Sequence, residues 1–317
     1  LFPWAIHSLV AHDPILQQQA RYFNPTWFII RAAIYFILLL LMTFSLCRNS
    51  IRYERGGDHR LVSRMQFVSE PSLVILLGII TLMSIDLVMA REAHFYSTVI
   101  GFLISMGQSL SAVVFAVALL LLLGDQPDQA PYVTKPVLID LGNMILMFVI
   151  LWAYMNLSQL LIIWMGNITD EATWYIHRGG LSGTAPNVWK YVGMILVILH
   201  FFVPFFVLLS RKAKQSVKFL GGLALVVLVM RVVDSYWLIA PSGPRNLEGH
   251  SSVSWMDIPL LLGIGGIWFF CFVGILRRRP VIARQELNPA EAAAKKLLDQ
   301  ARHKHVEHGG AAGASPA

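Results

Sequence analysis

The 317-residue chain has few charged residues and almost no cysteine. Asp, Glu, Lys and Arg together make up 14% of it, whereas soluble domains carry roughly 25%. This shortage, with 56% hydrophobic residues and a mean hydropathy of +0.62, excludes a cytosolic globular enzyme and a disordered or fibrous protein. The two cysteines, Cys47 and Cys271, are too few for a disulfide framework or for an iron–sulfur cluster held by this chain alone.

Several motifs that carry chemistry are also missing. The sequence contains no GxxxxGK[ST] phosphate loop and no CxxC pair. A haem inside a helix bundle usually needs two histidines on facing helices, and only His200 lies clearly within an apolar run. A histidine cluster near the C-terminus (His303, His305 and His308) is more typical of a solvated tail than of a metal site. We therefore expect that this chain binds no metal and holds no redox cofactor of its own.

What the sequence does have is seven apolar runs of about the length that crosses a bilayer, roughly 20 residues. Backbone groups in lipid must be hydrogen-bonded within the segment, so each run is predicted to be a helix. The sequence thus predicts an all-α integral membrane protein with seven transmembrane helices. The runs are Trp27–Cys47, Ser72–Met89, Val99–Leu123, Val137–Met165, Tyr191–Leu209, Phe219–Ala240 and Ile258–Leu276.

The net charge of +7 comes from Lys and Arg gathered in a few connections and in the tail, so it does not indicate a nucleic-acid partner. Basic residues concentrate after the first, fifth and seventh runs, which by the positive-inside rule places these connections and the C-terminus in the cytoplasm. The even-numbered connections are rich in Trp and Tyr and are predicted to lie at the outer face. Leu1 is then outside, and an odd number of helices before it would return the N-terminus to the inside. From Pro280 we expect a short amphipathic helix and a disordered end.

Ionisable groups inside apolar runs are costly and are functional candidates by default. Those of this chain are spread over successive depths of the predicted bundle, as a proton relay requires. The alternative is that each polar group only ties helices together, through interhelical hydrogen bonds worth roughly 1 kcal/mol. Both interpretations stay open from the residues alone. The candidates for a proton path are Asp86, Asp140, Tyr154, His200, Arg231 and Asp234.

Local spacing adds expectations about some polar residues. Arg231 and Asp234 are three residues apart on one helical face and can pair. Asp86 and Asp140 have no oppositely charged near neighbour in the sequence, and Arg31 is expected to snorkel or to pair near the outer face.

Two connections at the predicted outer face give further expectations about structure. Ser97 or Thr98 is expected to cap the third helix. The acidic and aromatic segment 167–174 suits either a docking surface for another subunit or an ordinary interfacial loop.

Ordered segments spread over most of the chain resemble the F subunit of bacterial alternative complex III. They are Phe2-Pro-Trp-Ala5, Asn24-Pro-Thr-Trp-Phe-Ile-Ile-Arg31-Ala-Ala-Ile-Tyr35-Phe36, His94-Phe-Tyr-Ser-Thr98, Leu151-Trp-Ala-Tyr-Met-Asn-Leu-Ser-Gln159 with Trp164 and Asn167-Ile168, Glu171-Ala-Thr-Trp-Tyr175, and Arg231-Val-Val-Asp234-Ser-Tyr-Trp237-Leu-Ile-Ala-Pro241.

The resemblance implies an architecture related to polysulfide-reductase-type membrane anchors. In that family ten helices form two four-helix bundles with a flanking helix at each end, and this chain would hold the last seven. The implied division is an outer segment (1–26), the rest of the first bundle with a basic cytoplasmic loop (27–98), the second bundle (99–240), an outer loop with the last helix (241–279), and a cytoplasmic tail (280–317).

The resemblance also implies a function. The chain would be a non-redox subunit of a quinol-oxidising complex in the bacterial inner membrane, which passes electrons to cytochrome c or a terminal oxidase. Its implied partners are a sister quinol-binding membrane subunit, an outer-face iron–sulfur subunit, c-type haem subunits, a cytochrome oxidase and lipids. Quinol is a candidate ligand, and the helix bundle is a candidate proton path. The alternatives are a stand-alone secondary transporter, although no matching pair of interrupted helices is evident, and a purely structural anchor.

Overall fold

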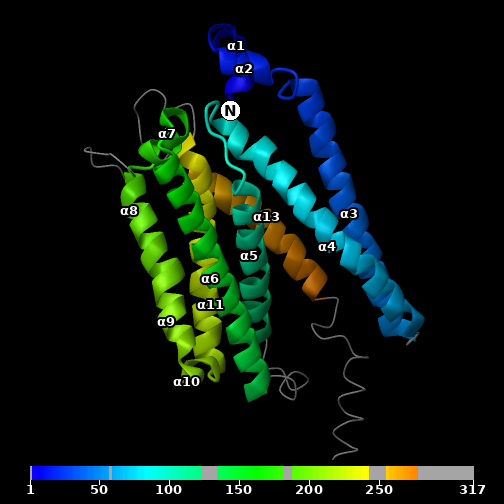
Figure 1. Cartoon of the computed structure of the whole chain (residues 1–317). Helices are drawn as coiled ribbons and strands as arrows, with labels where there is room; N and C mark the ends of the chain where they lie inside the picture. The colour runs from blue at the N-terminus through cyan, green and yellow to red at the C-terminus, as the bar shows by residue number, and fades with distance from the viewer. Residues whose placement is uncertain (1, 57–58, 123–133, 181–187, 243–254, 278–317) are drawn as a thin grey trace, which may run out of the picture. The chain divides into compact units, whose positions relative to one another are not determined.

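The computed structural model describes residues 2–56, 59–122, 134–180, 188–242 and 255–277 (Figure 1). These residues form helices joined by turns and short connections, and no strand occurs among them. The predicted tail helix and the histidine cluster at 303–308 lie outside the described residues, as does the C-terminus.

Within the described ranges, seven helices are long and apolar enough to cross a membrane. The all-α prediction and the seven predicted spans are thereby confirmed. The fifth span is built from three consecutive pieces, of which η3 is a π-helical segment. The spans correspond to α3 (Pro25–Gly56), α4 (His59–Leu87), α5 (Ile100–Leu122), α6 (Lys135–Gly166), α8–η3–α9 (Val188–Ile195, Leu196–Phe202 and Val203–Leu209), α11 (Val217–Ile239) and α13 (Asp257–Leu276).

The connection between the first two spans differs from the expectation. The sequence predicted a basic loop between Cys47 and Ser72, but α3 continues to Gly56 and α4 begins at His59. Arginine has high helix propensity, and helical hydrogen bonds are local, so a helix can extend beyond its apolar stretch. The helix α4 even includes Pro71, whose ring removes one backbone donor from the interior of the helix.

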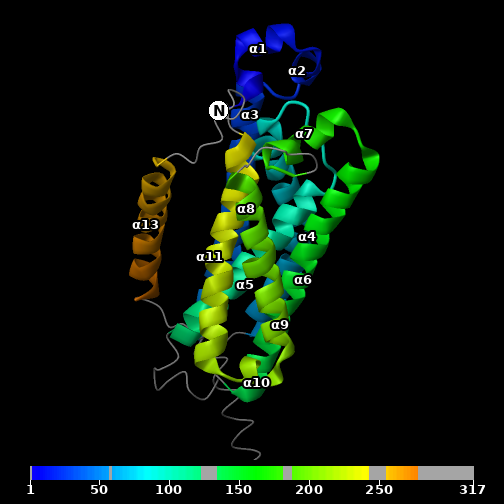
Figure 2. The ribbon, with the colours of Figure 1, turned by 90° about the vertical axis from the view of Figure 1, so that its left-hand side faces the viewer.

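Short helices precede the first span and connect the later ones. They are η1 (Pro3–Ala5), α1 (His7–His12), α2 (Pro14–Gln19), η2 (Met89–Arg91), α7 (Thr169–His177), α10 (Arg211–Lys214) and η4 (Ala240–Ser242). Helices α7 and α10 lie at opposite ends of the long helices (Figure 2). We call these the α7 end and the α10 end.

The chain divides into two compact units. The first comprises residues 1–42 and 71–258, and the second comprises residues 43–70 and 259–317. The second unit thus contains the C-terminal part of α3, the N-terminal part of α4 and almost all of α13. Every polar site described below belongs to the first unit.

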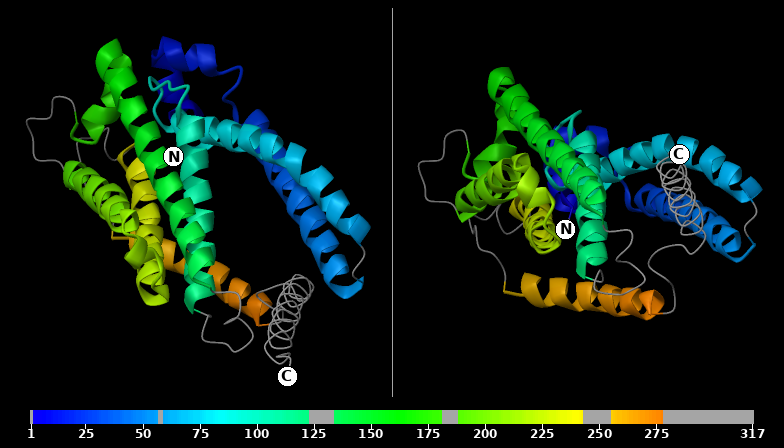
Figure 3. Two further views of the ribbon diagram at one scale, coloured as in Figure 1. Left: turned by 60° about the horizontal axis from the view of Figure 1, so that its bottom comes forward. Right: turned by 90° about the horizontal axis from the view of Figure 1, so that it is seen from below.

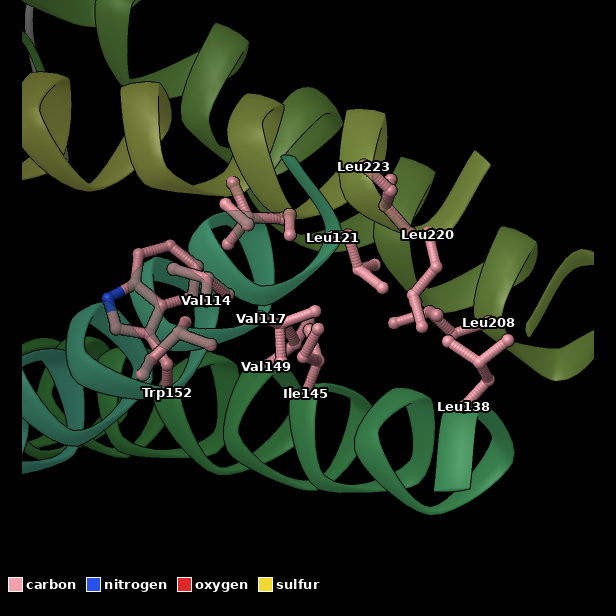
Figure 4. Packing of buried hydrophobic residues seen from close by; sticks show 14 residues of the cluster. Val114, Val117, Leu121, Leu138, Ile145, Val149, Trp152, Leu208, Leu220 and Leu223 are labelled. Atoms are coloured by element: carbon pink, nitrogen blue, oxygen red, sulfur yellow. The ribbon is translucent and has the colours of Figure 1, made fainter. Parts of the chain in front are cut away.

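Helices α5, α6, α8–η3–α9 and α11 pack along one another in the first unit (Figures 2 and 3). Their shared core is mostly aliphatic, with Val114, Ile145, Val149, Leu208 and Leu220 almost fully buried (Figure 4). Lipid is as apolar as these side chains, so close packing, rather than exclusion from water, holds such helices together. Any polar group inside this bundle therefore needs a partner, either on its own helix or on a facing one.

Candidate functional site

A group of polar side chains lies inside the bundle, which we call the bundle cluster: Ser111, Trp152, His200, Arg231 and Asp234. Its centre is the pair Arg231 and Asp234 on α11, which are 5% and 1% exposed. Residues three apart on an α-helix share a face, and the Arg231 guanidinium donates through Nη1 to Oδ2 of Asp234. The ion pair predicted from the sequence is confirmed.

Two other helices complete the bonding of this ion pair. From α5, the Ser111 hydroxyl accepts a hydrogen bond from Nε of Arg231 at 3.1 Å. From α6, the indole Nε1 of Trp152 donates to Oδ2 of Asp234 at 3.3 Å. Gly107 leaves the space that the guanidinium occupies, because a Cβ atom there would collide with it. The Arg231–Asp234 pair on α11 is thus hydrogen-bonded to α5 through Arg231 and to α6 through Asp234.

His200 is the third ionisable member of the bundle cluster and is fully buried. It lies in the π-helical segment η3, and its ring centroid is 4.1 Å from that of Trp152. Neither ring nitrogen has a hydrogen-bond partner among the described residues. Short π-helical segments are frequent at functional sites, and buried polar atoms without protein partners are where water or a ligand binds. The described residues thus leave both ring nitrogens of His200 open to a water molecule or a ligand.

Two other predicted path residues lie away from this cluster. Tyr154 is 60% exposed and Asp140 is also exposed, both on α6. The inward face of α6 carries Leu138 and Trp152, and a residue two positions further along a helix points about 200° away. The sequence pattern of α6 is apolar on all sides, so it gave no indication of which face is buried.

Asp86 belongs to a separate ion pair between α3 and α4. Its carboxylate accepts hydrogen bonds from Nε and Nη2 of Arg31 at 2.9 and 3.2 Å, and from the Tyr35 hydroxyl at 3.0 Å. Arg31 also stacks over the ring of Tyr22, 3.8 Å from its centroid. The expected pairing of Arg31 is confirmed. The sequence suggested no partner for Asp86, since the two residues are 55 positions apart.

Sequence reasoning missed a buried arginine at the α7 end. Arg178 is 2% exposed and follows the end of α7. It donates to the carbonyl oxygens of Trp174, Trp237 and Leu238 at 2.7, 3.3 and 2.9 Å. Its guanidinium also stacks over the Trp174 ring, 3.6 Å from the centroid. The signal in the sequence was Trp174 four residues before Arg178, a spacing at which helical side chains meet.

Glu92 is the counter-ion of Arg178. Its Oε1 accepts from Nη1 of Arg178 at 3.3 Å and from the Ser242 hydroxyl at 2.6 Å. Burial raises the pKa of Glu92, but the neighbouring His177 imidazole, the Arg178 charge and Ser242 together lower this pKa below its ordinary value. Burial lowers the pKa of Arg178 to about 10, against the opposing charge of Glu92. Both groups are therefore ionised at neutral pH.

The expectations for the connections at this end are partly met. Ser97 accepts from the backbone N–H groups of Val99 and Ile100 at 3.2 and 3.1 Å, so it caps α5 as predicted. The segment 167–174 is mostly helical rather than an exposed loop, because α7 begins at Thr169. Trp174 is 3% exposed and stacks on Phe95, so this aromatic side chain packs inside the protein and not on a docking surface.

The two buried sites differ in their chemistry. The bundle cluster combines a carboxylate, an imidazole and an arginine at transmembrane depth, a set that can hold and pass a proton. The Glu92–Arg178 pair is a fixed ion pair at a helix end. Among the described residues, no three His, Cys, Asp or Glu side chains come together as a metal site. Comparison with known protein families and with curated proteins finds no match for this chain.

Proposed function

We propose that this chain is a non-redox membrane subunit of a quinol-oxidising respiratory complex of the alternative complex III type, and that its bundle cluster carries protons. In this proposal the chain lies in a bacterial inner membrane with the α7 end outside and the α10 end in the cytoplasm. Its seven spans are the last seven of a ten-helix subunit. Iron–sulfur and c-type haem subunits dock on the outer side, beside a sister quinol-binding subunit.

The observation that supports the proton role is the burial of Asp234 and His200 against one side chain, Trp152. The indole bonds the carboxylate and contacts the imidazole. Buried ionisable groups in membrane helices are expensive, and proton relays are among their main uses. The segments that resemble the F subunit support the choice of complex, since Arg231 and Asp234 lie in one of them.

In this proposal, each residue of the bundle cluster has a role that follows from its chemistry. Asp234 and His200 can each take up and release a proton. Arg231 keeps its charge at all physiological pH values, so it provides a permanent counter-charge for the carboxylate of Asp234. Ser111 accepts a hydrogen bond from the guanidinium, and Gly107 leaves the space that the guanidinium occupies. The proposal therefore narrows the predicted path to His200, Arg231 and Asp234.

The identity of the complex is tested by mild-detergent purification through this chain, followed by mass spectrometry and a haem stain. Co-purification of c-type haem and iron–sulfur subunits is the expected result. A lone, haem-free protein would contradict the proposal and favour the transporter alternative.

The proton role is tested in the purified complex reconstituted into vesicles. Asp234→Asn is expected to lower the number of protons translocated per quinol oxidised, while the complex still assembles. Asp140→Asn is the matched control, since it neutralises a carboxyl group on the exposed face of α6 and should leave that ratio unchanged. Unaltered translocation in Asp234→Asn would refute the proton path and favour a structural anchor.

A further inference from the structure

A cavity of about 400 Å³ lies at the α7 end of the first unit. Its walls come from η1, α1, α2, η2, α7 and η4, elements far apart in the sequence. The volume falls within the range of small-molecule sites, roughly 300–1,000 Å³. Apolar side chains, among them Leu9, Leu16 and Pro241, form part of the lining.

Three polar atoms in this lining are buried and lack partners among the described residues. They are Nε of Arg91, Oε2 of Glu92 and Nδ1 of His94. The Glu92 side chain is 9% exposed, and only its other oxygen, Oε1, bonds Arg178 and Ser242. Leaving a buried polar atom unpaired costs about 1–3 kcal/mol, so three such atoms around one cavity indicate that water or a ligand pairs with them there.

The chemistry of these atoms restricts that group. Arg91 Nε is a donor and Glu92 Oε2 is an acceptor. Because the neutral His94 ring donates through Nε2 to the Asp13 carboxylate, its Nδ1 is an acceptor as well. A hydroxyl group can accept from Arg91 and donate to one of the two acceptors, and a second hydroxyl group of the same ligand can donate to the other. A simple anion would face the Glu92 carboxylate, and a simple cation would face Arg91.

The formal charges around the cavity also cancel. Asp13 pairs with His94 at 3.0 Å, and Glu92 pairs with Arg178 at 3.3 Å. Counting histidines as neutral, Arg91 and Arg178 balance Asp13 and Glu92. The site is therefore matched to a ligand without net charge.

The position of the cavity indicates where its ligand comes from. Arg91 and Ser242 line the cavity, and each is the last residue of a candidate membrane span, Arg60–Arg91 and Val217–Ser242. The cavity thus lies at the ends of two candidate spans, and the ends of membrane spans are where the headgroups of amphiphiles lie.

We propose that this cavity binds the uncharged, hydroxyl-bearing headgroup of an amphiphile, with Arg91 donating to it and Glu92 accepting from it. Two sources carry this chemistry: a hydroquinone and a neutral glycerolipid. The proposal concerns binding alone and needs no electron acceptor. The headgroup proposal can therefore fail while the proposed respiratory function holds, and the respiratory function can fail while the headgroup proposal holds.

The test uses the purified full-length chain in detergent and three photoactivatable probes with matched alkyl chains. One is a hydroquinone, one is a monoacylglycerol, and one is the anionic lysophosphatidic acid. Saturable binding of a neutral probe, with crosslinks mapped by mass spectrometry to η1, α1, η2 or α7, is expected. The neutral probe that binds more tightly identifies the source.

Substitutions in the cavity lining test whether the probe binds there. Arg91→Met removes the donor and is expected to weaken binding about tenfold or more, as loss of one charged hydrogen bond implies. Arg21→Met is the matched control, because Arg21 is exposed at the same end and does not line the cavity. Leu9→Trp, at a partly exposed position on α1, should block the cavity without disturbing the bundle. Thermal melting verifies that each variant is folded.

Three results would overturn the proposal. They are absence of saturable binding by both neutral probes, tighter binding of the anionic probe, and equal affinity of the wild-type chain and a folded Arg91→Met or Leu9→Trp variant.

Discussion

Trp152 donates its indole N–H to the carboxylate of Asp234 across 3.3 Å, although the two residues are 82 positions apart. The same indole lies against His200, and Arg231 pairs with the same carboxylate oxygen, Oδ2 of Asp234. One tryptophan from α6 thus connects the ionisable residue of η3 to the ion pair of α11.

The Arg231–Asp234 pair is expected to show strong energetic coupling. Arg231→Leu or Asp234→Leu alone leaves one buried charge without its partner, which costs about 3–5 kcal/mol of unfolding free energy. The double variant removes both charges and should cost clearly less than the sum of the two single variants. Unfolding of the detergent-solubilised protein by sodium dodecyl sulfate measures the three values.

The control for this cycle is Lys218→Leu, which removes an exposed charge from the same helix and should change stability by less than about 0.5 kcal/mol. Additive losses in the double variant would show that the two side chains do not stabilise each other.

Gly107 is expected to be intolerant of even one methyl group. In Gly107→Ala the new Cβ collides with the Arg231 guanidinium, and such overpacking typically costs about 1–3 kcal/mol. Gly222→Ala on α11 is the matched control, because no atom lies within 4 Å of the Cβ that it adds. It should be neutral or stabilising, since alanine favours helices by up to about 1 kcal/mol over glycine. Thermal melting of both variants tests the contrast, and equal melting temperatures would contradict it.

Replacing His200 is expected to reduce proton transfer without reducing stability. His200→Leu replaces two unpartnered buried nitrogens by a side chain of similar size, so the unfolding free energy should stay unchanged or rise by about 1 kcal/mol. Proton translocation per quinol should fall in the same variant. Thermal melting and vesicle pumping measure the two quantities, and a marked loss of stability would show that the imidazole bonds a structural partner.

Acid is expected to destabilise the α7 end through Glu92. The pKa of this carboxyl group is lower in the folded chain than its ordinary 4.5. Its ionised form therefore stabilises the fold fully above the ordinary value, and this contribution is lost as the pH falls through the lowered folded pKa. Melting temperature measured between pH 7 and pH 3 should decline more for the wild-type chain than for Glu92→Gln. Parallel curves would exclude Glu92 as the source of the acid sensitivity.

The sequence predicted the membrane spans closely because their signal is local. An apolar run of about 20 residues must become a helix in lipid whatever else it contacts. For the same reason the Arg231–Asp234 pair was predictable, since both residues lie on one helical turn. The ends of α3 and α4 were not, because helix propensity alone carries those helices beyond their apolar parts.

The partners of the buried polar groups required the tertiary structure. Nothing in the sequence joined Asp86 to Arg31, Trp152 to Asp234, or Arg178 to Glu92, since each pair comes from different elements. The exposure of Asp140 and Tyr154 could not be predicted from the sequence either, because a helix that is apolar on all sides does not reveal its buried face. The sequence by itself determined that this protein is a bundle of membrane-spanning helices. The packing of those helices decided which ionisable groups of different helices meet, because a buried charge in lipid needs partners and the sequence spacing reveals only those on its own helix.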